Sequence, residues 1–308
     1  MNRTERGCSA LPLVLLVVSA TSCLRVRHVQ VTPSGELRAD VSTRSACNAD
    51  LQDLERITEQ LLPEVEVAAG ARFRHEPRVR VASSAVFADA LAAKFAADTP
   101  EATKTDPRRK EASDAWARRF APFLIGFYSA QEDVVYFAPS QIESVMKMLG
   151  GSDGECEDVV RLVLAHDLTH ALQQQRVDVA ALHASCETEQ GYGRLQTRIE
   201  GHASIVQTLV ARKLGLGEEV LDLSLRATMG AVASEDRAHD RALSLLWEQH
   251  RSVVAATEVW QRIVSACGQR VVWNALQASC AQRSLFDACS ETPACTACEL
   301  RPETVTVH

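Results

Sequence analysis

Two histidines, His166 and His170, stand four residues apart in the segment VRLVLAHDLTHALQQQ (residues 160–175). Because an α-helix turns once every 3.6 residues, this spacing places both imidazoles on one helical face, with their Cβ atoms about 5–6 Å apart. Two imidazoles so placed can bind one Zn²⁺ ion through bonds of about 2.0–2.1 Å. The alternative is that the two histidines bind no metal and are ordinary core or surface residues, because a chain with nine histidines often contains such a pair by chance.

A site with two histidines needs a third ligand, and Glu200 follows in the next long helical segment, within TRIEGHA (residues 197–203). If that helix returns antiparallel to the first, its carboxylate reaches the two imidazoles. Two histidines and a carboxylate, with water in the open position, form a known type of catalytic zinc site. His202 is a rival ligand, but it lies about 200° around the helix from Glu200, so only one of them can serve.

The segment VLAHDLTHALQQQ resembles VLAHELTHALQDQ, the zinc helix of HExxH metallopeptidases of the gluzincin type. The sequence EGHA (residues 200–203) resembles their EGEA or EGDA segment, and GFY (126–128) with VYF (135–137) is similar to the hairpin that precedes their zinc helix. The resemblance spans residues 120–215, about a third of the chain. It implies a zincin-like helical core, peptide-bond hydrolysis, and His166, His170 and Glu200 as the zinc ligands.

The chain departs from this family at the general base, where Asp167 replaces the glutamate that follows the first histidine. In the family this residue accepts a proton from zinc-bound water, whose pKa the metal lowers to about 7. Aspartate is one methylene shorter, and a misplacement of about 1 Å costs on the order of a hundredfold in rate. We therefore expect a weakened metallopeptidase. The alternative is a catalytically inactive zincin-fold envelope lipoprotein that acts as a binding or structural module.

The first 22 residues predict a signal peptide. Arg3 and Arg6 precede the apolar run LPLVLLVVSA (residues 11–20), which is too short to span a bilayer. The sequence ATSC (residues 20–23) resembles the lipobox of bacterial lipoproteins, which implies that Cys23 becomes the lipidated first residue of the mature chain. We expect the protein to be exported and anchored to a bacterial membrane by this lipid; simple secretion is the alternative.

The cysteine count favours export. Of ten cysteines, eight remain once Cys8 and Cys23 are set aside, and an even number suits a disulfide framework in an oxidising compartment. Four of them fall within residues 280–298, which predicts a cysteine-rich C-terminal tail over residues 279–308. The pair in CTAC (residues 295–298) could instead be half a zinc site or a redox pair.

The elements that position these residues are mostly helical. Only 14 glycines and 10 prolines interrupt 308 residues, which favours long helices. Apolar periodicity predicts helices at residues 49–62, 84–97, 141–149, 157–176, 187–214, 217–249 and 253–278, a strand at 79–81, a hairpin at 123–138 and a surface loop at 98–114. The fold class is therefore mostly α (α+β), with a tether at residues 23–48 and a helical domain at 49–278.

The composition and the motifs exclude some classes of binding partner and enzyme. A net charge of −7 disfavours nucleic-acid binding, and the sequence contains no phosphate-binding glycine loop and no GxSxG nucleophile motif. We expect a peptide or protein as substrate or ligand.

Overall fold

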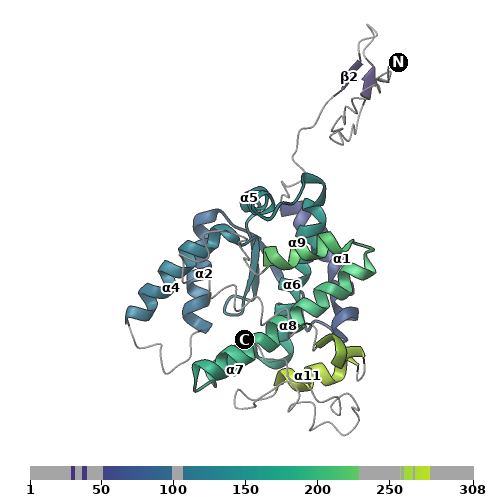
Figure 1. The fold of residues 1–308 in the computed structure, drawn as a ribbon. Helices are drawn as coiled ribbons and strands as arrows, with labels where there is room; N and C mark the ends of the chain where they lie inside the picture. Colours follow the sequence, from purple (N-terminus) through teal and green to yellow (C-terminus); the bar gives the residue numbers. More distant parts are fainter. Residues whose placement is uncertain are drawn as a thin grey trace, which may run out of the picture. The chain divides into compact units, whose positions relative to one another are not determined.

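The computed structural model describes residues 29–31, 37–39, 51–98, 107–228, 257, 260–265 and 268–277 (Figure 1). The chain divides into two units, Met1–Arg44 and Ser45–His308. In the first unit, β1 (Val29–Val31) pairs antiparallel with β2 (Leu37–Ala39). The predicted signal peptide, Cys23 and the cysteine-rich tail lie outside the described residues.

The second unit is built mainly from helices, which confirms the mostly α (α+β) class. Its longer helices are α1 (Leu51–Ala69), α2 (Ser84–Asp98), α4 (Pro107–Phe120), α5 (Pro139–Leu149), α6 (Cys156–Val177), α8 (Glu189–Lys213), α9 (Glu218–Thr228) and α11 (Gln269–Gln277). Shorter helical segments are η1 (Ala121–Phe123), η2 (Asp153–Glu155) and α7 (Val179–Ala184). Among the described residues, no helix combines the length and apolar character that a membrane span requires.

A small sheet has the strand order β3 (Arg78–Val81), β5 (Val134–Phe137) and β4 (Gly126–Ser129). The predicted hairpin is confirmed, because β4 pairs antiparallel with β5. β5 also pairs with β3, in parallel, so it lies in the middle of the sheet. All the residues of β4 and β5 are buried, which explains why their sequences read as continuous apolar runs.

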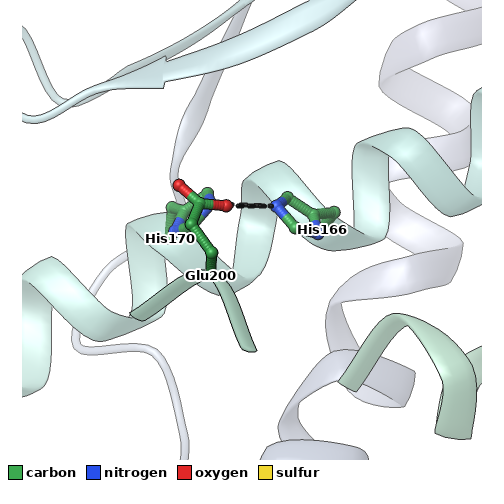
Figure 2. Close-up of side chains that lie close together, drawn as sticks. All are labelled: His166, His170 and Glu200. Carbon is green, nitrogen blue, oxygen red and sulfur yellow. Dashed lines mark hydrogen bonds and ion pairs between the residues drawn. The ribbon is translucent and has the colours of Figure 1, made fainter. Parts of the chain in front are cut away.

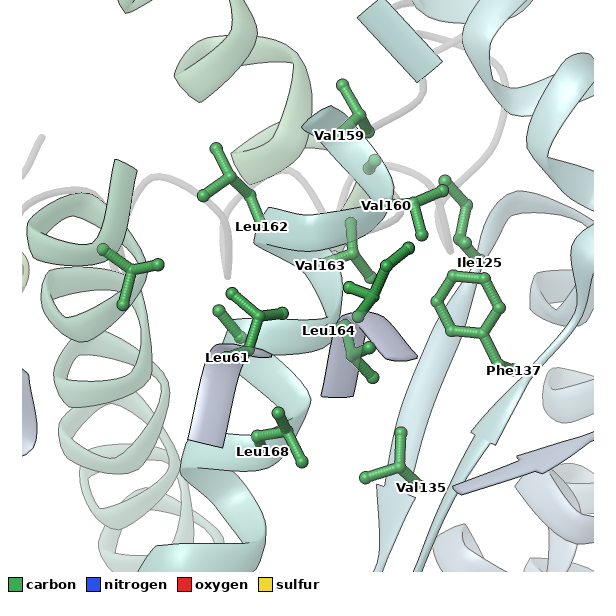
Figure 3. Packing of buried hydrophobic residues seen from close by; sticks show 14 of the residues in the cluster. Leu61, Ile125, Val135, Phe137, Val159, Val160, Leu162, Val163, Leu164 and Leu168 are labelled. Carbon is green, nitrogen blue, oxygen red and sulfur yellow. The ribbon is translucent and has the colours of Figure 1, made fainter. Parts of the chain in front are cut away.

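Helix α6 forms the centre of the main core, where it packs against α1, α8, α9 and β4 (Figure 3). Val163, Leu164 and Leu168 are all fully buried. Because these side chains leave the helix in different directions, the helix is covered by several neighbouring elements. A helix that is apolar on most of its faces belongs inside a domain. The candidate ligands on α6 are therefore carried by one of the most enclosed elements of the fold.

The predicted loop at residues 98–114 is wrong from Pro107 onward, because α4 begins at that residue. Proline is favoured in the first turn of a helix, where its missing N–H costs no hydrogen bond. The new helix packs on α2 through Trp116, whose ring centroid lies 4.0 Å from that of Phe120 and 6.4 Å from that of Phe95. Tertiary packing thus outweighs the charged composition of this segment.

Elsewhere the observed ends of the helices differ from the predicted ends by modest amounts. α1 continues past Pro63 because Val65 and Ala69 extend its buried face. α5 ends where Gly150 takes a left-handed backbone conformation, with φ 78°. In the segment predicted as one helix over residues 253–278, Gly268 has φ 75° and precedes α11. Of the segment predicted over residues 217–249, α9 accounts for the first part, and residues 229–249 lie outside the described residues.

Candidate metal centre

Helices α6 and α8 lie side by side and carry the site. Along α6, His166 contacts Gln207 while Gln173, further on, contacts Ile199. The two helices therefore run antiparallel, which is the arrangement that a third ligand on the second helix requires. Thr188 caps the start of α8 by accepting a hydrogen bond from the backbone N–H of Gly191 at 3.0 Å.

The structure brings His166, His170 and Glu200 together into one cluster (Figure 2). Nε2 of His166 lies 3.0 Å from Nε2 of His170 and 3.2 Å from Oε2 of Glu200. The third side of the triangle, from Nε2 of His170 to the same carboxylate oxygen, is 3.3 Å. Ligands bound tetrahedrally at about 2.0–2.1 Å are separated from one another by about 3.3–3.4 Å. The sides of the triangle lie within about 0.4 Å of this spacing, so the three atoms could hold a single metal ion.

The atoms of these side chains that point away from the cluster are held by glutamines. Nδ1 of His166 lies 3.1 Å from Oε1 of Gln207, and Nδ1 of His170 lies 2.8 Å from Oε1 of Gln173. The amide nitrogen of Gln196 donates to Oε1 of Glu200 at 2.7 Å. Each candidate ligand thus has an outer partner, which is the usual support of a metal-binding side chain.

The electrostatics of the cluster reflect burial and mutual attraction. Burial lowers the pKa of His166. Burial also acts to lower the pKa of His170, but the Glu200 carboxylate outweighs it and the pKa is raised. Burial alone would raise the pKa of Glu200, whereas the two imidazoles hold it well below its usual range. The cluster therefore keeps a buried carboxylate ionised, and this negative charge favours the binding of a cation.

Asp167 lies beside the cluster on the same helix and is only 3% exposed. Its Oδ2 atom has no hydrogen-bond partner among the described residues. A Cβ atom added to Gly126 of β4 would meet this oxygen at 2.5 Å, so the absence of a side chain at Gly126 makes room for the carboxylate. Burial raises the pKa of Asp167 to about 7.

His202, the rival ligand, lies outside the cluster. Its Nδ1 atom is 2.9 Å from the amide nitrogen of Gln173, and its ring lies 5.1 Å from that of Trp273 between centroids. The side chain is fully buried. The helical phase explains this placement, because His202 leaves α8 on nearly the opposite side from Glu200.

The sequence reasoning missed the three glutamines and Gly126. The glutamines carried a usable signal: Gln173 follows His170 by one helical turn, and Gln196 and Gln207 lie one turn before and two turns after Glu200 on its face. Gly126 lies in the predicted hairpin, but nothing in the sequence signalled its contact with Asp167, which joins a strand to a helix far along the chain.

No protein-family model and no curated protein matches this chain. Among solved structures, the fold is similar to that of a protein from Chloroflexus aurantiacus described as a "putative hydrolase with a novel fold". The TM-score is 0.52 at 14% sequence identity, and the match covers 79% of this chain and 89% of the other. At this identity the likeness concerns the fold alone, so the chemistry of the site rests on the side chains of the cluster.

Proposed function

We propose that the protein is a zinc-dependent hydrolase of the metallopeptidase type. The observation that carries this proposal is the triangle of His166 Nε2, His170 Nε2 and Glu200 Oε2, whose sides of 3.0, 3.2 and 3.3 Å are close to the spacing of about 3.3–3.4 Å in a tetrahedral zinc site. These three residues would hold the ion. When bound, zinc would supply a water molecule of lowered pKa and polarise a substrate carbonyl. The description of the similar Chloroflexus aurantiacus protein as a "putative hydrolase" agrees with this assignment.

In this proposal Asp167 accepts the proton of the attacking water. It adjoins His166 in the sequence, its carboxylate is buried, and one of its oxygens is unpartnered among the described residues. Gln196 leaves Oε2 of Glu200 directed at the cluster by donating to the other oxygen of that carboxylate. The substrate would be a peptide or protein, as the resemblance of the zinc helix implies.

We further propose that the protein works outside the cytoplasm, anchored through a lipid on Cys23. The support is the charged start, the short apolar run and the ATSC sequence of residues 20–23. We also propose that Cys156 and Cys186, both buried, form disulfides with cysteines outside the described residues. Such bonds persist in an oxidising compartment.

A second candidate function is a catalytically inactive binding module with the same metal site. The aspartate at the general-base position favours it, because the shorter side chain withdraws the carboxylate from metal-bound water. This candidate keeps the zinc but predicts no cleavage of any peptide.

Metal analysis of protein purified without added metal tests the zinc site. We expect about one zinc ion per chain in the wild type and none in His166→Ala or His170→Ala. His75→Ala is the matched control, because His75 is an exposed histidine that pairs with Asp133. A wild type without metal, or a His170→Ala variant that retains it, contradicts the site. Zinc-dependent cleavage of a peptide library then separates the hydrolase from the binding module.

A further inference from the structure

We infer that Gln173, Gln207 and His202 are positioning residues, which fix the protons of His166 and His170 on Nδ1 so that both Nε2 lone pairs face the metal position. A neutral imidazole carries its proton on either nitrogen, and only the unprotonated nitrogen can bind a metal. The tautomers matter for function only if a metal binds, so the role assigned here rests on the proposed function.

The orientation of the Gln173 amide follows from a backbone carbonyl. Its nitrogen lies 2.9 Å from the carbonyl oxygen of Ile199, which can only accept a hydrogen bond. The amide nitrogen must therefore face Ile199, and the amide oxygen faces Nδ1 of His170 at 2.8 Å. Because that oxygen can only accept, the His170 proton lies on Nδ1.

His202 completes the bonding of this amide. The second N–H of Gln173 points to Nδ1 of His202 at 2.9 Å, so His202 accepts there and carries its own proton on Nε2. The neutral ring lies against Trp273 and Trp260, with centroid distances of 5.1 and 6.3 Å. A neutral acceptor can be buried among these aromatic rings at little cost in free energy. A carboxylate at the same position would bury an unpaired charge, which is costly.

The orientation of the Gln207 amide follows from two hydroxyl groups. Ser224 donates its hydroxyl proton to the carbonyl oxygen of Leu221 at 2.8 Å, and Thr228 donates its proton to the carbonyl oxygen of Ser224 at 2.8 Å. Both hydroxyl oxygens are therefore left to accept from the amide nitrogen of Gln207, at 3.1 and 3.3 Å. The amide oxygen faces Nδ1 of His166, whose proton it accepts.

The hydrogen bonds of Gln173 and Gln207 have the same consequence for both histidines. With both protons on Nδ1, the lone pairs of two Nε2 atoms and of the Glu200 carboxylate meet within 3.3 Å with no proton of their own between them. Three lone pairs at this separation repel one another until a cation, either a proton or a metal ion, lies between them. The glutamines thus hold the site ready for a metal ion.

The first test measures the tautomers directly in the full-length chain. Long-range ¹H–¹⁵N correlation spectra of metal-free protein with ¹⁵N-labelled histidine are recorded at pH 9. We expect His166 and His170 to carry their protons on Nδ1 and His202 to carry its proton on Nε2. A proton on Nε2 of His170 or His166 overturns the assignment, and this reading requires neither a variant nor a metal.

The second test measures zinc affinity by competition with a chelator. Gln173→Leu and Gln207→Leu should each weaken binding by about 10–100-fold. Gln174→Leu is the matched control, because Gln174 is the adjacent glutamine and its amide donates instead to Asp178. His202→Leu should weaken binding, and His202→Asn should largely restore it, because the asparagine oxygen can accept at the position of Nδ1.

The outcomes separate this inference from the proposed function. Nδ1 tautomers in a wild type that binds no zinc would contradict the hydrolase and leave the tautomer assignment intact. Zinc bound equally by the wild type, Gln173→Leu and Gln207→Leu would contradict the positioning role alone. Circular dichroism and melting of each variant show whether it is folded, and the wild-type tautomers decide the question if a variant is not.

Discussion

Asp167 is the residue whose identity governs what the candidate metal centre can do. His166, His170 and Glu200 form the group that could hold a metal ion, and Asp167 is not one of them. Its carboxylate is buried beside the cluster, and its Oδ2 atom lies against Gly126. In the proposed function, metal binding and proton transfer therefore depend on different side chains and can be separated by substitution.

Asp167→Asn should abolish peptide hydrolysis while zinc remains bound, because an amide cannot accept the proton of the water. Asp167→Glu extends the carboxylate by one methylene and should raise the rate by about 10–100-fold. Hydrolysis of a peptide library, normalised to zinc content, measures both effects. A lower rate in Asp167→Glu would instead show that the backbone compensates for the shorter side chain and that the longer one crowds the site.

At the scale of elements, the site depends on how closely β4 approaches α6. Gly126 provides the contact, because any side chain there meets Oδ2 of Asp167 at 2.5 Å and a ring carbon of Phe137 at 3.1 Å. The strand is buried and paired with β5, so it cannot move away freely. The position of the Asp167 carboxylate is thus set by the sheet as well as by its own helix.

Gly126→Ala should therefore displace the Asp167 carboxylate and lower hydrolysis, while zinc content is unchanged. Crowding in a packed core should also lower the free energy of unfolding by about 1–3 kcal/mol. Urea unfolding and peptide hydrolysis measure the two effects. Gly217→Ala is the control, because a Cβ atom there meets nothing within 4 Å. Full activity in Gly126→Ala would show that the contact does not position Asp167.

At the scale of the whole molecule, the candidate ligands come from two central helices that pack together. His166 and His170 lie on α6 and Glu200 on α8, and α6 also packs against α1, α9 and β4. A metal ion that binds only the folded chain stabilises it by mass action. The proposed zinc site should therefore contribute to the stability of the folded chain as well as to chemistry.

Removal of zinc by a chelator should lower the melting temperature by about 10 °C, the shift expected if free zinc is about a thousandfold above its dissociation constant. Differential scanning calorimetry with and without the chelator measures the shift. The His170→Ala variant should melt at the same temperature in both conditions. An equal shift in this variant would show that the chelator acts elsewhere.

The proposed lipid on Cys23 also concerns the whole molecule, because it determines where the protein works. Expression in a bacterial host should yield a membrane-bound protein whose N-terminal peptide carries a lipid adduct in mass spectrometry. Cys23→Ser should remove the adduct and release the protein from the membrane. An unmodified N-terminus at another residue would contradict the anchor.

The sequence by itself determined the features that depend on neighbours within a few helical turns. The spacing of His166 and His170 specifies their common face, and apolar periodicity predicted the helix that carries them. The strand-forming runs around residues 126–137 predicted the hairpin, whose partners are close in the chain. Pro107 shows the limit of local reasoning, because its charged surroundings indicated a loop where packing on α2 supports a helix.

Only the tertiary structure decided which distant groups complete the site. The contact of His166 with Glu200 joins residues 34 apart, and its contact with Gln207 joins residues 41 apart. Helical phase indicated that Glu200 and His202 could not both be ligands, but it could not show that His202 bonds to Gln173. Contacts of this kind depend on how α6, α8 and β4 pack, and packing is determined by the whole core rather than by any one segment. The orientations of the glutamine amides, and with them the positions of two protons, therefore follow from the folded protein alone.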